Sequence, residues 1–156
     1  ISNTEAAAER GVFGIPTFFV GDRDYLNVKF SGKMRTDNGD DDWIGMVFGF
    51  ESLGLKTDYP ITLKTYVFSW KQRDQGAWQE GFSLFEVNGT FNNKAELINA
   101  FRNPSSGLGF LASDFGSALG YQTGQDNEIS ISYTSTKITV YVNGVLVLEK
   151  KTRTWA

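Results

Sequence analysis

Short segments of alternating apolar and polar residues, separated by turn signals, constrain the fold of this chain most strongly. The alternation is clear in Tyr25–Met34, Glu128–Thr134, Lys137–Val142 and Val145–Lys150. A period of two is typical of a strand with one buried and one solvated face. Asn143-Gly144 joins two of these segments and predicts a type I′ hairpin turn. These segments therefore predict an antiparallel β-sheet.

Three longer segments are also strand-like. Trp43–Phe50 is almost continuously apolar, which predicts a strand buried on both faces in the middle of a sandwich. Ile61–Trp70 places Tyr66, Phe68 and Trp70 on one face, and Gly81–Val87 is expected to end in a turn at Asn88-Gly89.

One helix is expected over Asn92–Phe101, capped by Asn92 or Asn93. The Gly- and Ser-rich residues 103–127 predict little regular structure apart from a short strand near Leu108–Leu111. About eight strands and no alternation of strands with helices predict an all-β fold, an antiparallel β-sandwich with one or two short helices. We expect residues 1–156 to form a single domain, excised from a larger protein.

Composition excludes several classes of function. The 156 residues include neither cysteine nor histidine, so thiol chemistry, thiolate metal sites and a histidine base are excluded. The formal net charge is −3 and no long basic run exists, which argues against a nucleic-acid partner. No apolar segment is long enough to predict insertion into a membrane.

An acidic run precedes the most apolar segment. Asp40, Asp41 and Asp42 lead directly into Trp43. Adjacent carboxylates repel one another, and a hard cation with oxygen ligands would neutralise them, with Ca²⁺ fitting best. A helix-loop-helix calcium loop does not explain the run, because its fifth position would be Ile44, which carries no side-chain oxygen. A solvated acidic turn without metal is the alternative.

The expected calcium ligands are oxygen-bearing side chains of this loop. They are Asp40, Asp41 and Asp42, with Asp37 and Asn38 as further candidates. Calcium takes six to eight oxygen ligands, so residues from other loops are required as well. Asp74, Asp114, Asp126 and Asn127 could complete the set.

A second group of residues suggests ligand binding. Trp70 and Trp78 could form a platform on which a sugar ring stacks, although core packing is the favoured interpretation of Trp70, which lies on a strand with alternating aromatic residues. Lys71, Gln72 and Arg73, followed by Asp74, could recognise a carboxylate or sulfate. A solvated turn is the simpler interpretation of these charges.

Several segments together resemble the C-terminal domain of thrombospondins and its bacterial relatives. The matching positions are Asn27, Phe30 and Gly32, then Asp40–Asp42, then Trp43, Gly45, Val47, Phe48 and Gly49, then Trp70, Lys71 and Gln72. The likeness is close over residues 17–75 and looser over 120–150. Residues 52–64 are longer and more polar than in that family, and the cysteine and calcium-rich repeats of the eukaryotic proteins are missing.

The resemblance implies a concanavalin-like jelly roll of the L-type lectin kind that binds calcium through the Asp40–Asp42 loop and functions in adhesion. It further implies an extracellular or cell-surface module, of a bacterial adhesin type, that binds carbohydrate or peptide on a cell surface as a monomer. Two alternatives remain open: a glycan-active enzyme on the same scaffold, and a structural spacer that uses calcium only for rigidity. We expect no enzyme, because Glu80 and Glu86 are isolated and glycoside hydrolysis needs paired carboxylates.

Overall fold

A computed structural model of the chain describes residues 26–37, 39, 43–52, 58–76, 78–102 and 110–151. This part forms two four-stranded antiparallel sheets and one helix. The first sheet has the order β1 (Val28–Met34), β6 (Asn127–Tyr133), β7 (Lys137–Val142) and β8 (Val145–Lys151). The second has the order β2 (Trp43–Ser52), β3 (Ile61–Lys71), β4 (Gly81–Phe91) and β5 (Phe110–Phe115).

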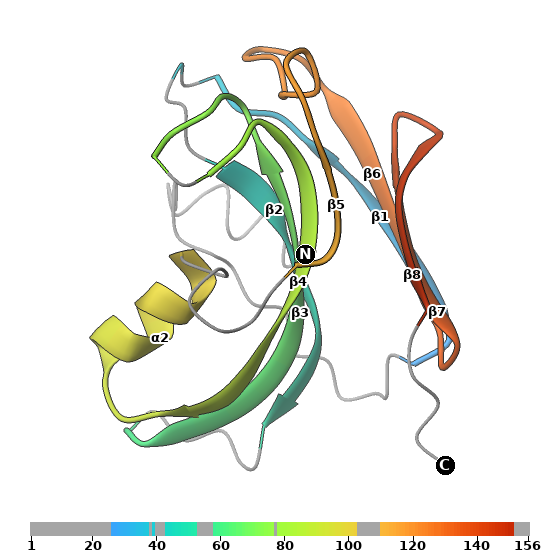
Figure 1. Cartoon of the computed structure of the whole chain (residues 1–156). Coiled ribbons are helices and arrows are strands. Elements are labelled where there is room, and N and C mark those ends of the chain that lie inside the picture. The colour runs from blue at the N-terminus through green and yellow to red at the C-terminus, as the bar shows by residue number, and fades with distance from the viewer. Residues whose placement is uncertain are drawn as a thin grey trace, which may run out of the picture.

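The two sheets lie face to face as two layers, which confirms the predicted β-sandwich (Figure 1). The chain passes from one sheet to the other between β1 and β2 and again between β5 and β6. Alternate residues of the central strands fill the space between the layers, since successive side chains of a strand point to opposite faces. The fully buried residues of this core include Phe68, Leu84, Ile129, Ile131, Ile138 and Val140.

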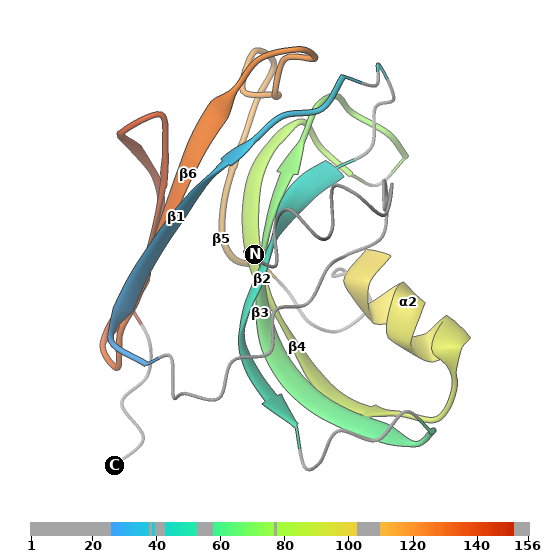
Figure 2. The same ribbon diagram turned by 180° about the vertical axis from the view of Figure 1, so that it is seen from behind.

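A second, smaller core lies on the outer face of the β2–β5 sheet. Helix α2 (Lys94–Arg102) covers this face, on the side away from the other sheet (Figure 2). Val67 of β3 and Phe85 of β4 are fully buried there, and Ala100 of the helix, at 8% exposure, packs with them. Strand β3 is therefore buried on both faces, with Phe68 and Trp70 facing the sandwich and Val67 facing the helix side.

The helix begins as its sequence predicts. The side-chain Oδ1 of Asn93 accepts a hydrogen bond from the backbone N–H of Glu96 at 3.0 Å. The Glu96 carboxylate in turn accepts from the backbone N–H of Asn92 at 2.8 Å. This reciprocal arrangement satisfies donors that the first turn of a helix leaves unpaired. In the part of the chain that is described, no helix has the length and apolar character needed to cross a bilayer.

The prediction that Trp43–Phe50 is a strand buried on both faces in the middle of the sandwich is wrong. In the described part of the chain β2 pairs with β3 alone and forms an edge of its sheet. Phe48 is its buried residue, whereas Phe50 is 42% exposed. The centrally placed strand is β3, which has β2 on one side and β4 on the other.

Two further expectations are corrected. Asn88-Gly89 forms no turn, because β4 continues through it to Phe91 and pairs Asn88 with Lys64 of β3. Strand β5 covers Phe110–Phe115, so it extends further along the chain than the short strand expected near Leu108–Leu111.

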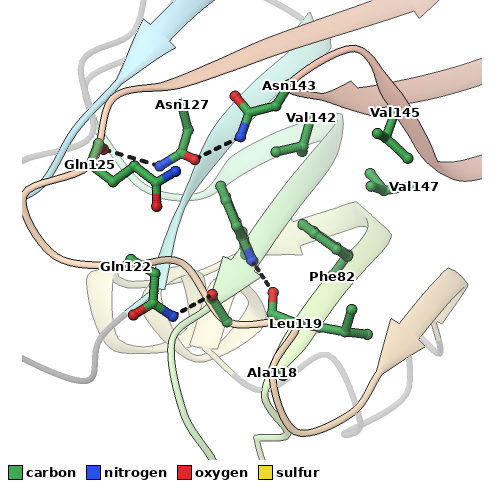
Figure 3. Close-up of a pocket in the computed structure, with 12 residues that line it drawn as sticks. Phe82, Ala118, Leu119, Gln122, Gln125, Asn127, Val142, Asn143, Val145 and Val147 are labelled. Atoms are coloured by element: carbon green, nitrogen blue, oxygen red, sulfur yellow. Dashed lines mark hydrogen bonds between the residues drawn. The ribbon is translucent and has the colours of Figure 1, made fainter.

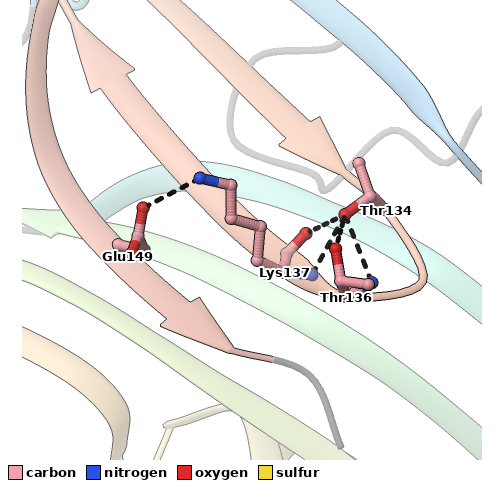
Figure 4. Close-up of polar contacts among 4 residues, drawn as sticks. All are labelled: Thr134, Thr136, Lys137 and Glu149. Atoms are coloured by element: carbon pink, nitrogen blue, oxygen red, sulfur yellow. Dashed lines mark hydrogen bonds and ion pairs between the residues drawn. The ribbon is translucent and has the colours of Figure 1, made fainter. Parts of the chain in front are cut away.

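The predicted β7–β8 hairpin is confirmed. Asn143 and Gly144 have φ values of 51° and 79°, as a type I′ turn requires. At the other end of β7, the Thr134 hydroxyl accepts from the backbone N–H of Lys137 at 3.0 Å, and the Lys137 ammonium meets the Glu149 carboxylate at 3.2 Å (Figure 4). These contacts close the β6–β7 turn and link β7 to β8.

Candidate functional site at the loop end of the sandwich

Three connections meet at one end of the sandwich. They follow β1 (residues 35–37), join β3 to β4 (72–80) and join β5 to β6 (116–126). The register aligns the strand ends, because Trp43, Lys71, Gly81 and Phe115 lie in successive pairs across the β2–β5 sheet. The three connections cluster at the upper end of the molecule in Figure 1.

Two acidic residues hold these connections together. The Asp74 carboxylate accepts from the backbone N–H of Glu80 at 2.7 Å, which closes the β3–β4 connection on itself. The Glu80 carboxylate accepts from the backbone N–H groups of Ala118 and Gly120, at 2.7 and 3.0 Å. Residues about forty positions apart in the sequence are thereby fixed to one another. Asp74, a predicted ligand-binding residue, thus has a structural contact at this end.

Lys71 and Gln72 are buried, at 2% and 8% exposure, so the interpretation of a solvated turn is wrong for both. The Lys71 ammonium donates to Gln75 Oε1 at 2.8 Å, and Gln72 Nε2 donates to Thr123 Oγ1 at 3.0 Å. Gln72 is covered by the 116–126 connection, in which Gly120 packs against the Gln72 backbone and Thr123 binds its side chain. Arg73, by contrast, is exposed.

Gln72 also carries an unpaired polar atom. Among the described residues no donor reaches its side-chain oxygen Oε1, although the atom is buried. A buried carbonyl oxygen without a partner costs about 1–3 kcal/mol. A carbonyl oxygen of this kind can coordinate a metal cation.

Asp37 lies next to a bridging arginine. Arg35 Nε lies 2.7 Å from Asp37 Oδ1, and Arg35 Nη1 lies 3.5 Å from Asp126 Oδ1. The hydrogen bond and the charge of Asp37, with a smaller effect of Asp126, raise the pKa of Arg35 above its ordinary value. Two of the carboxylates considered as calcium ligands are therefore brought to one guanidinium group.

The remaining expected ligands do not assemble into a site within the described residues. Asn38, Asp40, Asp41 and Asp42 lie outside those residues. Asp114 is an exposed residue of β5. No cluster of three or more His, Cys, Asp or Glu side chains able to hold a metal occurs in the described ranges.

The two tryptophans expected to form one platform lie in different cores. Trp70 is 5% exposed and belongs to the core between the sheets, where its Nε1–H donates to Leu119 O at 2.6 Å. Trp78 packs on the helix side of the sheet, with its ring centroid 6.4 Å from that of Phe85. Since one sheet separates them, they do not form a shared platform.

A pocket of about 290 Å³ lies beside Trp70, between the 116–126 connection and the β7–β8 hairpin (Figure 3). Four carboxamide side chains line it, those of Gln122, Gln125, Asn127 and Asn143. This group is not recognisable as a ligand pocket in the sequence, because its members come from two separate segments, residues 122–127 and Asn143. The pairing of Asn127 with Asn143, at 3.0 Å, depends on the β6–β7 register.

Comparison with known proteins finds one curated relative. The chain is similar to thrombospondin-2 of Gallus gallus. The two sequences are 34% identical over 96 residues, which is 54% of this chain and 7% of the relative. This chain thus spans a small part of the length of thrombospondin-2. No protein-family model matches it, and no solved structure matches it significantly.

The similarity supports the predicted resemblance to a thrombospondin-like domain. It gives no support to the narrower expectation of a bacterial adhesin.

Proposed function

We propose that this chain is an extracellular, thrombospondin-like module that binds calcium at the loop end of its sandwich and uses that end to bind a ligand in adhesion. The observation that carries the proposal is the similarity to thrombospondin-2 of a chain whose acidic run leads into an edge strand of a β-sandwich.

Covalent geometry supports a position for the calcium ion near Gln72. One peptide bond joins Asp42 to Trp43, and Trp43 lies opposite Lys71 in the β2–β3 register. Consecutive Cα atoms are about 3.8 Å apart, so the last residue of the acidic run is one such step from Trp43, whose partner Lys71 directly precedes Gln72. The unpaired Gln72 Oε1 is a ligand atom of the kind that calcium accepts, alongside carboxylates and backbone carbonyls.

In this proposal Asp40, Asp41 and Asp42 supply carboxylate ligands and Gln72 a carbonyl oxygen. Asp37 and Asn38 are the further candidates. The ion would balance the repulsion of adjacent carboxylates and occupy the unpaired position at Gln72. The competing explanation uses protein cations, because Lys71 is buried near the start of β2 and Arg35 holds Asp37.

Thermal unfolding with and without calcium separates these explanations. A ligand present at a hundred times its dissociation constant stabilises the folded state by about 2.7 kcal/mol. For a chain of this size that corresponds to a rise in melting temperature of roughly 5–10 °C. We expect such a rise when calcium replaces a chelator. Equal melting temperatures in calcium and in chelator would favour the competing explanation, in which Lys71 and Arg35 neutralise the carboxylates.

Variants locate the ion. Asp42→Asn should reduce the rise, whereas Asp58→Asn, at an exposed residue before β3, should leave it unchanged. Gln72→Glu places an additional anion at the unpaired oxygen, so it should lower the melting temperature in chelator and enlarge the rise in calcium. A Gln72→Glu variant whose calcium-dependent rise equals that of the unaltered chain would exclude Gln72 as a ligand.

The proposal treats the chain as a binding module without catalytic activity. The two isolated glutamates have structural contacts: Glu80 binds the 116–126 connection, and Glu86 lies 3.9 Å from the ammonium group of Lys64. Glycan and peptide arrays, probed in calcium and in chelator, would reveal the ligand class. Absence of binding on both arrays would favour a structural spacer. In a separate assay, release of reducing ends from a polysaccharide would favour an enzyme.

A further inference from the structure

The pocket beside Trp70 combines an apolar side with a side made of carboxamides. Val142, Val145 and Val147 form the apolar side on the β7–β8 hairpin, with Phe82 of β4 below them (Figure 3). Val145 is 64% exposed, so this side is open to solvent. A ligand that entered the pocket would cover the valine side chain, which favours binding through the hydrophobic effect.

Trp70 contributes a fixed apolar surface to the pocket. Its Nε1–H is occupied by Leu119 O, and its ring lies 5.1 Å from that of Phe82 and 5.9 Å from that of Tyr121, measured between centroids. The indole therefore offers ring carbons and no hydrogen-bond donor.

Two of the carboxamides are held rigidly. Asn127 is 3% exposed; its Oδ1 accepts from Asn143 Nδ2 at 3.0 Å, and its Nδ2 donates to Gln125 O at 3.1 Å. Asn143 Oδ1 accepts from the backbone N–H of Glu128 at 2.9 Å. Each amide nitrogen carries two hydrogens, and each of these contacts uses one. Within the described residues, one N–H of Asn127 and one of Asn143 therefore remain for a ligand.

Gln122 and Gln125 supply adaptable groups at the rim. Both side chains are exposed, and within the described part of the chain no hydrogen bond holds the Gln125 carboxamide. The Gln122 amide makes a single long contact, to Gly120 O at 3.4 Å. These carboxamides can donate to or accept from a ligand hydroxyl.

Among the described residues that line the pocket there is no Asp, Glu, Lys or Arg. A charged ligand would lose hydration there without gaining a counter-charge, which is costly. The pocket therefore selects a small, neutral molecule that has hydroxyl groups on one edge and an apolar face. Its volume is close to the lower end of ligand pockets, about 300 Å³.

We propose that this pocket binds a neutral sugar ring, with hydroxyl groups against the carboxamides of Gln125, Asn127 and Asn143 and the C–H face against Val145. The inference rests on the ligand-binding part of the proposed function and is independent of the calcium ion.

Titration of the ¹⁵N-labelled chain with neutral sugars tests the proposal directly. D-Glucose, D-galactose, D-mannose and N-acetyl-D-glucosamine are the probes, and D-glucuronate is the charged control. We expect at least one neutral sugar to shift the side-chain amide signals of Asn127, Asn143 and Gln125, while D-glucuronate leaves them in place. Absence of shifts with all four neutral sugars, or equal shifts with D-glucuronate, would overturn the proposal.

Matched variants fix the location. Val145→Lys places a charge on the apolar side and should abolish binding, whereas Leu146→Lys alters the next residue of β8, also exposed but outside the pocket lining, and should retain it. Gln125→Ala should weaken binding about three- to tenfold through loss of one or two hydrogen bonds. Gln79→Ala, at an exposed glutamine elsewhere, should not. If Leu146→Lys weakened binding as much as Val145→Lys, the pocket would not be the site.

Melting temperatures of the same samples separate the two proposals. A calcium-dependent rise without sugar-induced shifts would reject the sugar pocket and retain the calcium site. Sugar-induced shifts without a calcium-dependent rise would do the opposite.

Discussion

Replacement of Glu80 tests whether the loop end is held by the contacts described above. Its carboxylate is the acceptor for two backbone N–H groups, those of Ala118 and Gly120, in a connection that is distant in sequence. Hydrogen bonds to a charged group contribute about 1.5–3 kcal/mol each. The Ala118 N–H can turn to water when the carboxylate is removed, because Ala118 is exposed, whereas Gly120 is buried.

We therefore expect Glu80→Ala to lower the free energy of unfolding by about 2–4 kcal/mol, with most of the loss at Gly120. Glu80→Gln keeps an acceptor oxygen and removes the charge, so its loss should be about half as large. The control is Glu149→Ala, which breaks the ion pair with Lys137. This pair is exposed, because the Glu149 side chain is 42% exposed and that of Lys137 is 52% exposed. Pairs of this kind contribute less than about 1 kcal/mol.

Urea denaturation followed by tryptophan fluorescence measures these differences. With a slope of about 1–3 kcal/mol per molar urea, Glu80→Ala should shift the midpoint by roughly 1–2 M at an unchanged slope. Amide hydrogen exchange at Gly120 should accelerate in parallel. If Glu80→Ala cost no more stability than Glu149→Ala, contacts other than those of the Glu80 carboxylate would hold the 116–126 connection.

Two further predictions concern the same connection. Ala118 has φ of 81° as the third residue of a tight turn, a conformation that costs a residue with a side chain about 1–2 kcal/mol, so Ala118→Gly should raise the melting temperature. A lowered melting temperature would show that this conformation is not strained. Gly120→Ala would drive a methyl group into the backbone oxygen of Gln72 and should cost about 1–3 kcal/mol or more by urea denaturation. Gly116→Ala, whose methyl group would meet only a side chain at 3.6 Å, should be tolerated, and equal losses for both variants would contradict the packing described for Gly120.

The half-buried strands could be predicted from the sequence because their pattern is local. Lys137–Val142 alternates between the two faces of its sheet, and Asn143-Gly144 has the two residues that a type I′ turn needs. The helix N-terminus at Asn93 is also encoded within a few residues. In each case the residues that determine the structure lie within a few positions of the structure they determine.

Contacts between distant segments explain the errors. Both Trp43–Ser52 and Ile61–Lys71 are strand-like, and only the pairing of β3 with β4 distinguishes the central strand from the edge strand. Asn88-Gly89 has the sequence of a hairpin turn, yet pairing with Lys64 and Leu63 keeps it extended. Gln72 is a polar residue directly after a strand, and its burial depends on a connection about fifty positions further along.

The 116–126 connection takes part in both proposed sites, which makes its anchoring the physical link between them. On one side Thr123 holds the amide of Gln72, and on the other Ala118, Gly120 and Gln125 line the pocket. Glu80 lines neither site and touches the connection only through its backbone. Binding is strongest when the protein groups that contact the ligand are held in place before it arrives, because ordering these groups on binding costs free energy. Loss of the Glu80 carboxylate should therefore weaken sugar binding without removing any ligand contact, whereas Glu149→Ala should not. Unchanged sugar affinity in the Glu80→Ala variant would mean that Asn127 and Asn143, held by the β6–β7 register, position the ligand without help from the loop.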